Sequence, residues 1–330
     1  MSARWSEERA WAWAQARLPL LGANYLPSSA VNSLEMWQEA SYDAAIIGQE
    51  LGWAKEIGLT SLRVFLPFAV WEAEGRVFLD RVDRFLGLAS EHGLSVMPVL
   101  FDDCAFAGRE PVLGAQPGPV VGVHNSGWVP SPGVTLAHDP SAWPRLKTYV
   151  QDILSRFGQD QRVLAWDLYN EPGNNNQGER SRPLLEAAFA WAREVKVDQP
   201  LTAGPWNAFE APLSQKMFEL SDVISFHAYE GPYFTRAKAE FCQQDGRPLL
   251  CTEWLHRLQG STVGEVLPVF RELGVSAYVW GLVNGRTQTH LSWDSRAGDA
   301  EPEVWQHDLL RPGGQPYDEE ERRLLGRGWA

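Results

Sequence analysis

The chain has 330 residues, of which 44% are hydrophobic and 22% charged, and its formal net charge is −13 at pH 7. These values are ordinary for a globular protein with a sizeable core, and they exclude disordered, collagen-like and coiled-coil chains. The negative charge argues against nucleic acid or an anionic membrane as a partner, because both are bound through basic patches. Tryptophan is abundant, at 16 residues, which indicates an aromatic core or a site that stacks on flat apolar faces.

The cysteines and the N-terminus bear on the cellular compartment. Cys104, Cys242 and Cys251 are odd in number and widely spaced, which favours free thiols over a disulfide framework or a zinc site. The first residues carry charges throughout and lack the apolar run of a signal peptide. A run of about 18 apolar residues, which a transmembrane helix needs, is also missing from the sequence. We therefore expect a cytoplasmic protein.

Short apolar runs alternate with longer amphipathic stretches along the chain. The apolar runs predict strands at Leu20–Asn24, Ser61–Leu66, Ser95–Phe101, Val163–Tyr169, Leu201–Gly204, Val223–His227, Leu249–Thr252 and Ala277–Leu282. The amphipathic stretches predict helices at Tyr42–Ile57, Asp80–His92, Trp143–Phe157, Arg182–Val195, Leu213–Glu219, Thr235–Gln243 and Val263–Leu273. Four of these helices should end at a C-terminal glycine, namely Gly58, Gly93, Gly158 and Gly274.

Continuously apolar strands that alternate with helices predict a parallel sheet covered on both faces. Eight such units predict a single (β/α)8 TIM barrel over about residues 20–285, preceded by a helix in residues 1–18 and followed by a tail, 294–330, with a helix at Asp318–Leu325. A doubly wound sheet is the alternative, but its glycine-rich phosphate turn is missing after the first strand. Pro98 in the third strand removes one ladder hydrogen bond.

A long segment rich in glycine and proline, residues 102–142, follows the third predicted strand. Loops of this length are usually functional or disordered. Because the loop leaves the carboxyl end of a strand, it should shape a site there, and we expect it to decide between internal and terminal cleavage of a polymeric ligand.

Two predicted strands end on a glutamate. Glu171 follows the fourth strand in Tyr169–Pro172, and Glu253 follows the seventh. In a barrel both carboxylates would lie at the carboxyl-end mouth, where active sites of this fold are found. Retaining glycosidases use such a pair, roughly 5–5.5 Å apart, in which one carboxyl protonates the leaving oxygen and the other attacks the anomeric carbon.

These residues resemble a known family. Tyr169–Pro172, together with Glu253 on a later strand, is similar to the (β/α)8 retaining glycosidases with glutamates on strands four and seven, and most of all to glycoside hydrolase family 5, the cellulase and mannanase family. Arg63 on the second strand and Trp280 on the eighth match the family in order, as do His227 and Tyr229, its His-x-Tyr on the sixth.

The resemblance implies a role for each glutamate. Glu171 would be the general acid/base, with a pKa raised by the anionic Glu253, and Glu253 would be the nucleophile. Arg63 and Tyr229 would donate hydrogen bonds that keep Glu253 ionised and oriented. Glu230 and Asp294, beside other strand ends, are alternative nucleophiles.

The remaining matched residues would hold the sugar. Asn170 would bond the 2-hydroxyl group, His227 would contact the sugar or the acid/base, and Trp280 would be the stacking floor. The sequence departs from the family after the third strand, where Asp102 and Asp103 stand in place of a histidine. One of these acids should contact the reacting sugar, although a loop cap would explain either.

Weaker candidates lie on the same face by their position in the chain. They are Asn24, Tyr25, Trp206, Asn207, Asn284 and Arg286 after strands, and Trp37, His124, Asn125 and Trp128 on flanking loops. For each of these a structural role is an equal alternative.

Other chemistries lack their motifs. There is no His-x-His metal pair after the first strand, no Gly-x-Ser-x-Gly elbow and no lysine within a predicted strand. We therefore expect a retaining β-glycosidase that acts on oligosaccharides and needs no cofactor or metal. A catalytically silent carbohydrate-binding barrel and a transglycosidase that uses the same residues are the alternatives, and the sugar, the linkage and the oligomeric state stay open.

Overall fold

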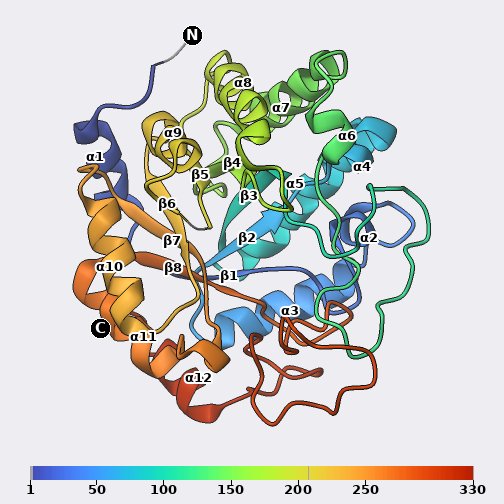
Figure 1. Ribbon diagram of the computed structural model, residues 1–330, viewed down its shortest axis with the longest axis vertical. Helices are drawn as coiled ribbons and strands as arrows, with labels where there is room; N and C mark the ends of the chain where they lie inside the picture. The colour runs from blue at the N-terminus through green and yellow to red at the C-terminus, as the bar shows by residue number, and fades with distance from the viewer. Residues whose placement is uncertain (1–2, 207, 330) are drawn as a thin grey trace.

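Eight parallel strands curl into a barrel surrounded by helices (Figure 1). The computed structural model describes residues 3–206 and 208–329. Its strands are β1 (Leu21–Asn24), β2 (Ser61–Phe65), β3 (Ser95–Asp102), β4 (Trp166–Asn170), β5 (Leu201–Gly204), β6 (Ile224–Ala228), β7 (Leu249–Trp254) and β8 (Ser276–Trp280). The predicted strands and the (β/α)8 barrel are confirmed.

The hydrogen-bonded ladders run in the order β5-β4-β3-β2-β1-β8-β7-β6. Between the two end strands, the hydroxyl groups of Thr202 and Ser225 lie 2.8 Å apart, and the amide of His227 donates to the carbonyl of Pro205 at 3.3 Å. These contacts close the barrel between β5 and β6. Pro98 remains inside β3, where it lies opposite Val64.

The seven helices predicted between strands are confirmed to within a few residues. The helices are α1 (Glu7–Arg17), α2 (Ser33–Trp37), α3 (Ala44–Glu56), α4 (Phe68–Glu74), α5 (Arg76–Glu91), α6 (Val134–Ala137), α7 (Trp143–Phe157), α8 (Arg182–Arg193), α9 (Pro212–Leu220), α10 (Pro232–Gln243), α11 (Val263–Leu273) and α12 (Glu319–Leu325). Two short 3-10 helices are η1 (Gly178–Ser181) and η2 (Arg257–Gln259). The short helices α2, α4 and α6 were not predicted, because four to seven residues are too few to show a period.

Capping residues fix several helix ends. The side chains of Asp43 and Thr262 accept backbone amides at the starts of α3 and α11, and Gly274 ends α11 with φ +65°. Gly58 and Gly93 likewise have positive φ, at +93° and +72°. Gly158 does not, because its φ is −67° and it simply continues the right-handed turn of α7.

The last position in the helical ring is taken by α12, the C-terminal helix, which Figure 1 shows near α11 and α3. Leu325 of α12 is buried, and a Cβ placed on Gly58, just after α3, would clash with the backbone of Leu325 and Gly326. On the other side, Arg271 of α11 donates to the carbonyl of Leu324 at 2.9 Å. Because α12 supplies the eighth helix, residues 281–318 pass over the barrel mouth and the chain joins the helical ring only after them.

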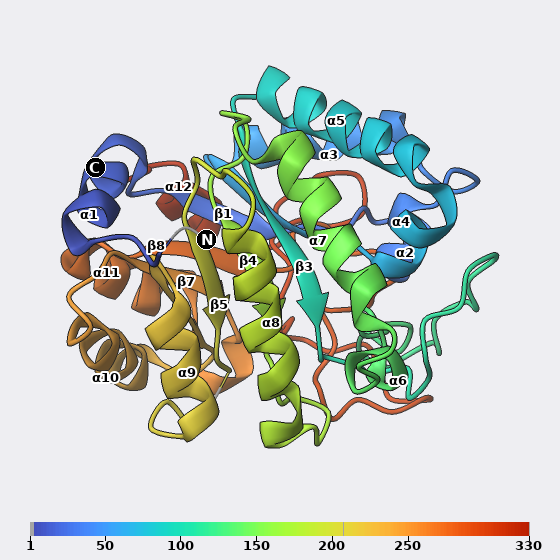
Figure 2. The same cartoon turned by 90° about the horizontal axis from the view of Figure 1, so that it is seen from above.

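The two ends of the barrel differ in character. At the amino end, Trp5 and Ala10 of the N-terminal segment pack on barrel residues such as Met97 and Tyr278. At the carboxyl end, toward which the β3 arrow points in Figure 2, lie α6 and the long loop that precedes it. Among the described residues, no helix is both long and apolar enough to cross a membrane.

Candidate active site

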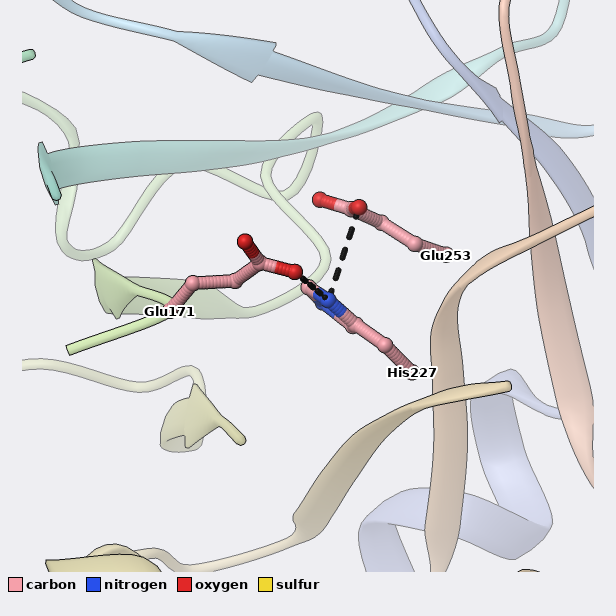
Figure 3. Close-up of side chains that lie close together, drawn as sticks. All are labelled: Glu171, His227 and Glu253. Carbon is pink, nitrogen blue, oxygen red and sulfur yellow. Dashed lines mark hydrogen bonds and ion pairs between the residues drawn. The ribbon is translucent and has the colours of Figure 1, made fainter. Parts of the chain in front are cut away.

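Glu171 and Glu253 lie close together at the carboxyl end of the barrel, with His227 between them (Figure 3). His227 Nδ1 is 2.7 Å from Glu171 Oε1 and 3.4 Å from Glu253 Oε2. One carboxylate oxygen of each glutamate and one ring nitrogen of His227 all lie within 4.8 Å of one another. This spacing is well below the roughly 6.5–9.5 Å between the carboxyl groups of inverting enzymes, and it fits a retaining pair.

Glu171 stands at the sharp turn that follows β4. Its backbone has φ +46°, which is uncommon for a residue with a side chain and typical of functional sites. The turn is held because the amide of Asn174 donates to the carbonyl of Glu171 at 3.0 Å. The Asn174 side chain also donates to Glu171 Oε2 at 2.5 Å, so both carboxylate oxygens of Glu171 have a partner.

Arg63 of β2 is bonded to four side chains. Its Nη1 donates to Glu253 Oε1 at 2.8 Å and to Asn24 Oδ1 at 2.7 Å. Its Nη2 donates to Asp167 Oδ2 at 2.7 Å and to Asn170 Oδ1 at 2.6 Å. Arg63 is fully buried, so these partners replace the water that its charge would otherwise require. The expected contact with Glu253 is present, whereas Asp167 was missed by the sequence reasoning.

Asp102 lies behind Asn170 instead of in the cavity. Its Oδ1 accepts the Asn170 side-chain amide at 2.8 Å, and its Oδ2 accepts the Trp128 indole N–H at 2.8 Å. Asp103 is also buried, where it accepts the Tyr169 hydroxyl at 2.6 Å and the Gly173 amide at 2.8 Å. The two acids therefore support the residues around Glu171, and the sequence-based expectation that one of them touches the sugar is not what the geometry favours.

The environments of the two glutamates set different protonation behaviour. Burial raises the pKa of Glu171 to about 7, against the opposing effects of Asn174 and Arg63. Burial also raises the pKa of Glu253, and the nearby Glu171 adds to this, while the Arg63 guanidinium and the hydroxyl of Tyr229 oppose it. The raised pKa of Glu171 was expected to come from Glu253, but burial is its main cause.

Two contacts of Glu253 favour its ionised form and so oppose the effect of burial on its pKa. Tyr229 donates its hydroxyl to Glu253 Oε2 at 2.7 Å, and Arg63 donates to Oε1. Both donors stabilise the charged form. Burial lowers the pKa of His227 to about 4, so its ring is neutral near pH 7 and adds no charge between the glutamates.

A cavity of about 340 Å³ opens above these side chains. It is lined by Cys104, Phe106, His124, Asn170, Glu171, Asn174, Trp206, Tyr229, Glu230, Lys238, Glu253, Gln259, Trp280 and Trp293. Both glutamates and the expected Asn170, Tyr229 and Trp280 therefore face one space, and so does Trp206. Arg63 and His227 lie just beneath it, bonded to the lining residues Glu253 and Glu171, and Asn24 is bonded to Arg63.

Several of the weaker candidates have structural partners away from this cavity. Tyr25 donates to Glu50 at 2.8 Å, Trp37 donates to the carbonyl of Phe65 at 2.8 Å, and Arg286 is paired with Glu35. Asn284, Asn125 and Trp128 are also not among the described residues that line the cavity. Asn207 falls outside the described part of the chain.

The two alternative nucleophiles are placed unfavourably. Glu230 lines the cavity but its carboxylate is paired with Lys238, at 2.7 and 2.8 Å. Asp294 is exposed on the loop next to Trp293. Neither has the arginine and tyrosine donors that hold Glu253.

Some cavity residues could not be identified from the sequence. Phe106 and Trp293 come from long loops whose paths depend on distant contacts, and Lys238 and Gln259 follow β6 and β7 without a motif. Asn174 could have been predicted, because the side chain of an asparagine three residues after a glutamate can bond that glutamate across a turn.

Glu171, His227 and Glu253 are also the one group of described residues with spacing suitable for a metal ion. The donors around them do not fit that use. The Arg63 guanidinium already occupies Glu253 Oε1, and the Tyr229 hydroxyl donates to Oε2. A metal would have to displace these donors and would lie beside a buried positive charge.

Comparison with known proteins agrees with the fold. The sequence model of the cellulase family, glycosyl hydrolase family 5, matches residues 118–285, just over half of the chain, so the chain belongs to this family. It is accordingly a glycoside hydrolase that acts on β-glycosidic bonds with retention of configuration. No curated protein sequence matches it significantly.

Solved structures of several glycosidases share the fold. An exo-β-1,4-mannosidase from Opitutaceae bacterium strain TAV5 has a TM-score of 0.63 at 18% identity, over 93% of this chain and 59% of the mannosidase. A GH5_18 variant from Streptomyces cattleya, in complex with Manβ1-4GlcNAc, has a TM-score of 0.65 at 14% identity, over 94% and 80% of the two chains. Thermotoga maritima Cel5A, in complex with cellobiose, has a TM-score of 0.61 at 15% identity, over 93% and 96%.

Proposed function

We propose that this protein hydrolyses β-1,4-linked manno- or gluco-oligosaccharides, with Glu171 as the acid/base and Glu253 as the nucleophile. The observation that carries the assignment is the asymmetry between the two glutamates. Glu253 accepts from Arg63 and Tyr229, which favour its ionised form, while burial keeps Glu171 protonated up to about pH 7. A nucleophile and an acid need these opposite protonation states at the same pH.

In the first step, an oxygen of Glu253 forms a bond to the anomeric carbon as the bond from that carbon to the leaving oxygen breaks. Glu171 gives its proton to the leaving oxygen, so the aglycone departs as a neutral alcohol. The product is a glycosyl ester of Glu253. Ester formation removes the negative charge of Glu253 and leaves Glu171 ionised.

In the second step, ionised Glu171 takes a proton from water as the water oxygen attacks the anomeric carbon. The ester bond breaks, Glu253 recovers its negative charge and Glu171 its proton. Two inversions give a sugar with the starting β configuration. His227, which is neutral and bonded to Glu171 Oε1 at 2.7 Å, keeps the acid/base oriented through both steps.

The sugar that reacts would lie between Trp280 and Asn170. Trp280 is half-buried and presents part of its indole to the cavity, where a sugar ring can stack. The amide of Asn170 is fixed by Arg63 and Asp102, and it would bond the 2-hydroxyl group. The choice of β-1,4-linked manno- and gluco-sugars rests on the ligands and activities named for the similar structures.

The assignment is tested with aryl β-glucosides and β-mannosides, using Glu171→Ala, Glu253→Ala and the exposed control Asp294→Ala. We expect Glu171→Ala to lose about 10²–10⁴-fold on poor leaving groups, and Glu253→Ala to lose all turnover. With azide, Glu171→Ala should give the β-glycosyl azide and Glu253→Ala the α-glycosyl azide. The roles are wrong if the azide products are reversed, or if Asp294→Ala loses as much activity as either variant.

A further inference from the structure

Two loops are joined across one side of the barrel mouth. They are the β3 loop, residues 103–133, and the β8 loop, residues 281–310, which run near each other in teal and red at the lower right of Figure 1. The Gln288 side chain of the β8 loop accepts from the amide of Gly122 at 2.9 Å. It also donates to the carbonyls of Val120 and Val123, at 2.8 and 3.0 Å. We call Gln288 and these three backbone positions the loop clamp.

The loops are joined a second time next to the cavity. The amide of Asn125 donates to the carbonyl of Thr287 at 2.7 Å. His124, which lines the cavity, is held by the hydroxyl of Ser295 at its amide and by the carbonyl of Leu291 at its ring, each at 2.9 Å. His124 and Asn125 are both buried, so the two loops form a packed wall.

Aromatic side chains fill the space behind this wall. Trp128 of the β3 loop packs against Phe65 and Trp280, with ring centroids 5.0 and 5.7 Å apart, and Phe65 lies 6.0 Å from Trp280. The cavity left on that side of Trp280 has a volume of only about 30 Å³. This is room for roughly one or two water molecules, not for a sugar ring.

The side of the site that is filled can be assigned from the chemistry. The leaving oxygen must lie next to Glu171 after β4, so the aglycone extends toward β4 and its neighbour β5. The rest of the reacting sugar lies over Trp280 at the end of β8, which is separated from β4 by β1, β2 and β3 in the sheet order. A second sugar on the glycone side would therefore need the space that Phe65, Trp128 and the joined loops occupy.

The opposite side of the cavity is open. Trp206, after β5, is 39% exposed at the cavity edge. Tyr233 and Phe234, at the start of α10 and just after the cavity residue Glu230, are 78% and 60% exposed. The exposed aromatic face of Trp206 at this edge can support a further sugar unit of the leaving group.

We infer that the protein removes one sugar unit at a time from the non-reducing end of its substrate, and that the loop clamp enforces this limit. The inference rests on the proposed function, because it takes Glu171 as the acid. The glycone pocket accepts one ring because the β3 and β8 loops close it, and the aglycone side accepts chains of several units. Gln288 is a specificity-determining residue that acts through loop position, without touching the substrate.

The test follows the first products from p-nitrophenyl β-biosides of the gluco and manno series, with the matching monosides as reference. Cleavage from the end gives free monosaccharide and the p-nitrophenyl monoside first, and p-nitrophenol only after a lag. A glycone site for two units gives p-nitrophenol and intact disaccharide at once. The second pattern would overturn the inference, whereas no hydrolysis of any monoside or bioside would count against the proposed function itself.

The loop clamp is tested with Gln288→Ala and the matched control Gln116→Ala. Gln116 is a glutamine of the β3 loop whose side-chain nitrogen donates to the carbonyls of Val112 and Gly114. Its Oε1 accepts from Asn32 and Arg109. Opening the clamp should raise the ratio of disaccharide to monosaccharide released from the bioside by about tenfold, while Gln116→Ala keeps the wild-type ratio. Equal ratios in the two variants would remove Gln288 from the explanation, and Trp128→Leu offers a second way to open the same wall if Gln288→Ala does not fold.

Discussion

Asn170 is bonded to Asp102 at one end of its side-chain amide and to Arg63 at the other, at 2.8 and 2.6 Å. This leaves a single orientation for the amide, because a carboxylate can only accept and a guanidinium can only donate. The position of the amide next to Glu171 is thus set before substrate arrives. Asp102, which stands where the family has a histidine after the third strand, therefore serves to position Asn170.

Replacing Asp102 with alanine should therefore lower kcat more than it raises KM. We expect a loss of about 10–100-fold in kcat, as for other residues that orient a group in contact with substrate. The specific readout is a 2-deoxy aryl glycoside. The penalty for removing the 2-hydroxyl should be smaller in Asp102→Ala than in the wild type, because the misplaced Asn170 no longer gains from that group. Equal penalties in both proteins would show that Asp102 does not act through Asn170.

The pH dependence of kcat/KM should show a basic limb near pH 7. Glu171 must be protonated to act as the acid, and burial raises its pKa to about 7, so activity falls as the pH rises through that value. The limb should disappear in Glu171→Gln assayed with a 2,4-dinitrophenyl glycoside, whose leaving group needs no proton. A basic limb that persists unchanged in this variant would have to be assigned to another group.

The same shift predicts how stability varies with pH. Because the pKa of Glu171 is higher in the folded protein than its ordinary value of 4.5, the folded state binds the proton more tightly. Its contribution is present in acid and is lost as the pH rises from about 4.5 through about 7. Glu171→Gln should therefore gain stability relative to the wild type over this interval, by on the order of 3 kcal/mol. Urea denaturation at pH 5 and pH 8 measures the difference, and Asp294→Asn should show no comparable change.

Arg63→Lys should damage both folding and catalysis. A lysine offers a single ammonium group in place of the planar fork that reaches Glu253, Asp167 and two amides. It would leave one of the buried carboxylates without its cation, which costs about 3–5 kcal/mol when a buried pair is broken. We expect a lower midpoint of urea denaturation and a loss of kcat. The same exchange at the exposed Arg182 of α8 should change neither, and a fully active, stable Arg63→Lys protein would contradict the role given to the fork.

The barrel and the two glutamates could be predicted because their signals are local. Each strand is a short apolar run, and Glu171 and Glu253 stand where such runs stop. Asp167 could have been found by the same logic, since a buried Arg63 needs more than one partner and Asp167 is an acid inside a predicted strand. The sequence also placed Asp102 and Asp103 near the site, but it could not show that their carboxylates turn away from the cavity.

The walls of the cavity could not be predicted, for a physical reason. Phe106, His124 and Trp293 reach the cavity only because loops more than 150 residues apart in sequence bond to each other, as His124 does to Leu291 and Ser295. A period in the sequence reports burial against a neighbouring element, and it carries no information on which distant loop will pack on another. For the same reason, the sequence could not show that α12 packs beside α11 as the eighth helix of the barrel.

The position of α12 makes the substrate pocket depend on a segment that follows all eight strands in the chain. Residues 281–310 wall the mouth, and Arg257 donates to the carbonyls of Trp305 and Asp308 in this segment, at 3.2 and 2.9 Å. Arg257 is itself paired with Glu321 of α12, at 2.6 and 2.8 Å. During synthesis the eight strands and both glutamates are complete before this helix emerges. A chain cut before α12 would still carry both glutamates, but the wall that selects the substrate would lack its support.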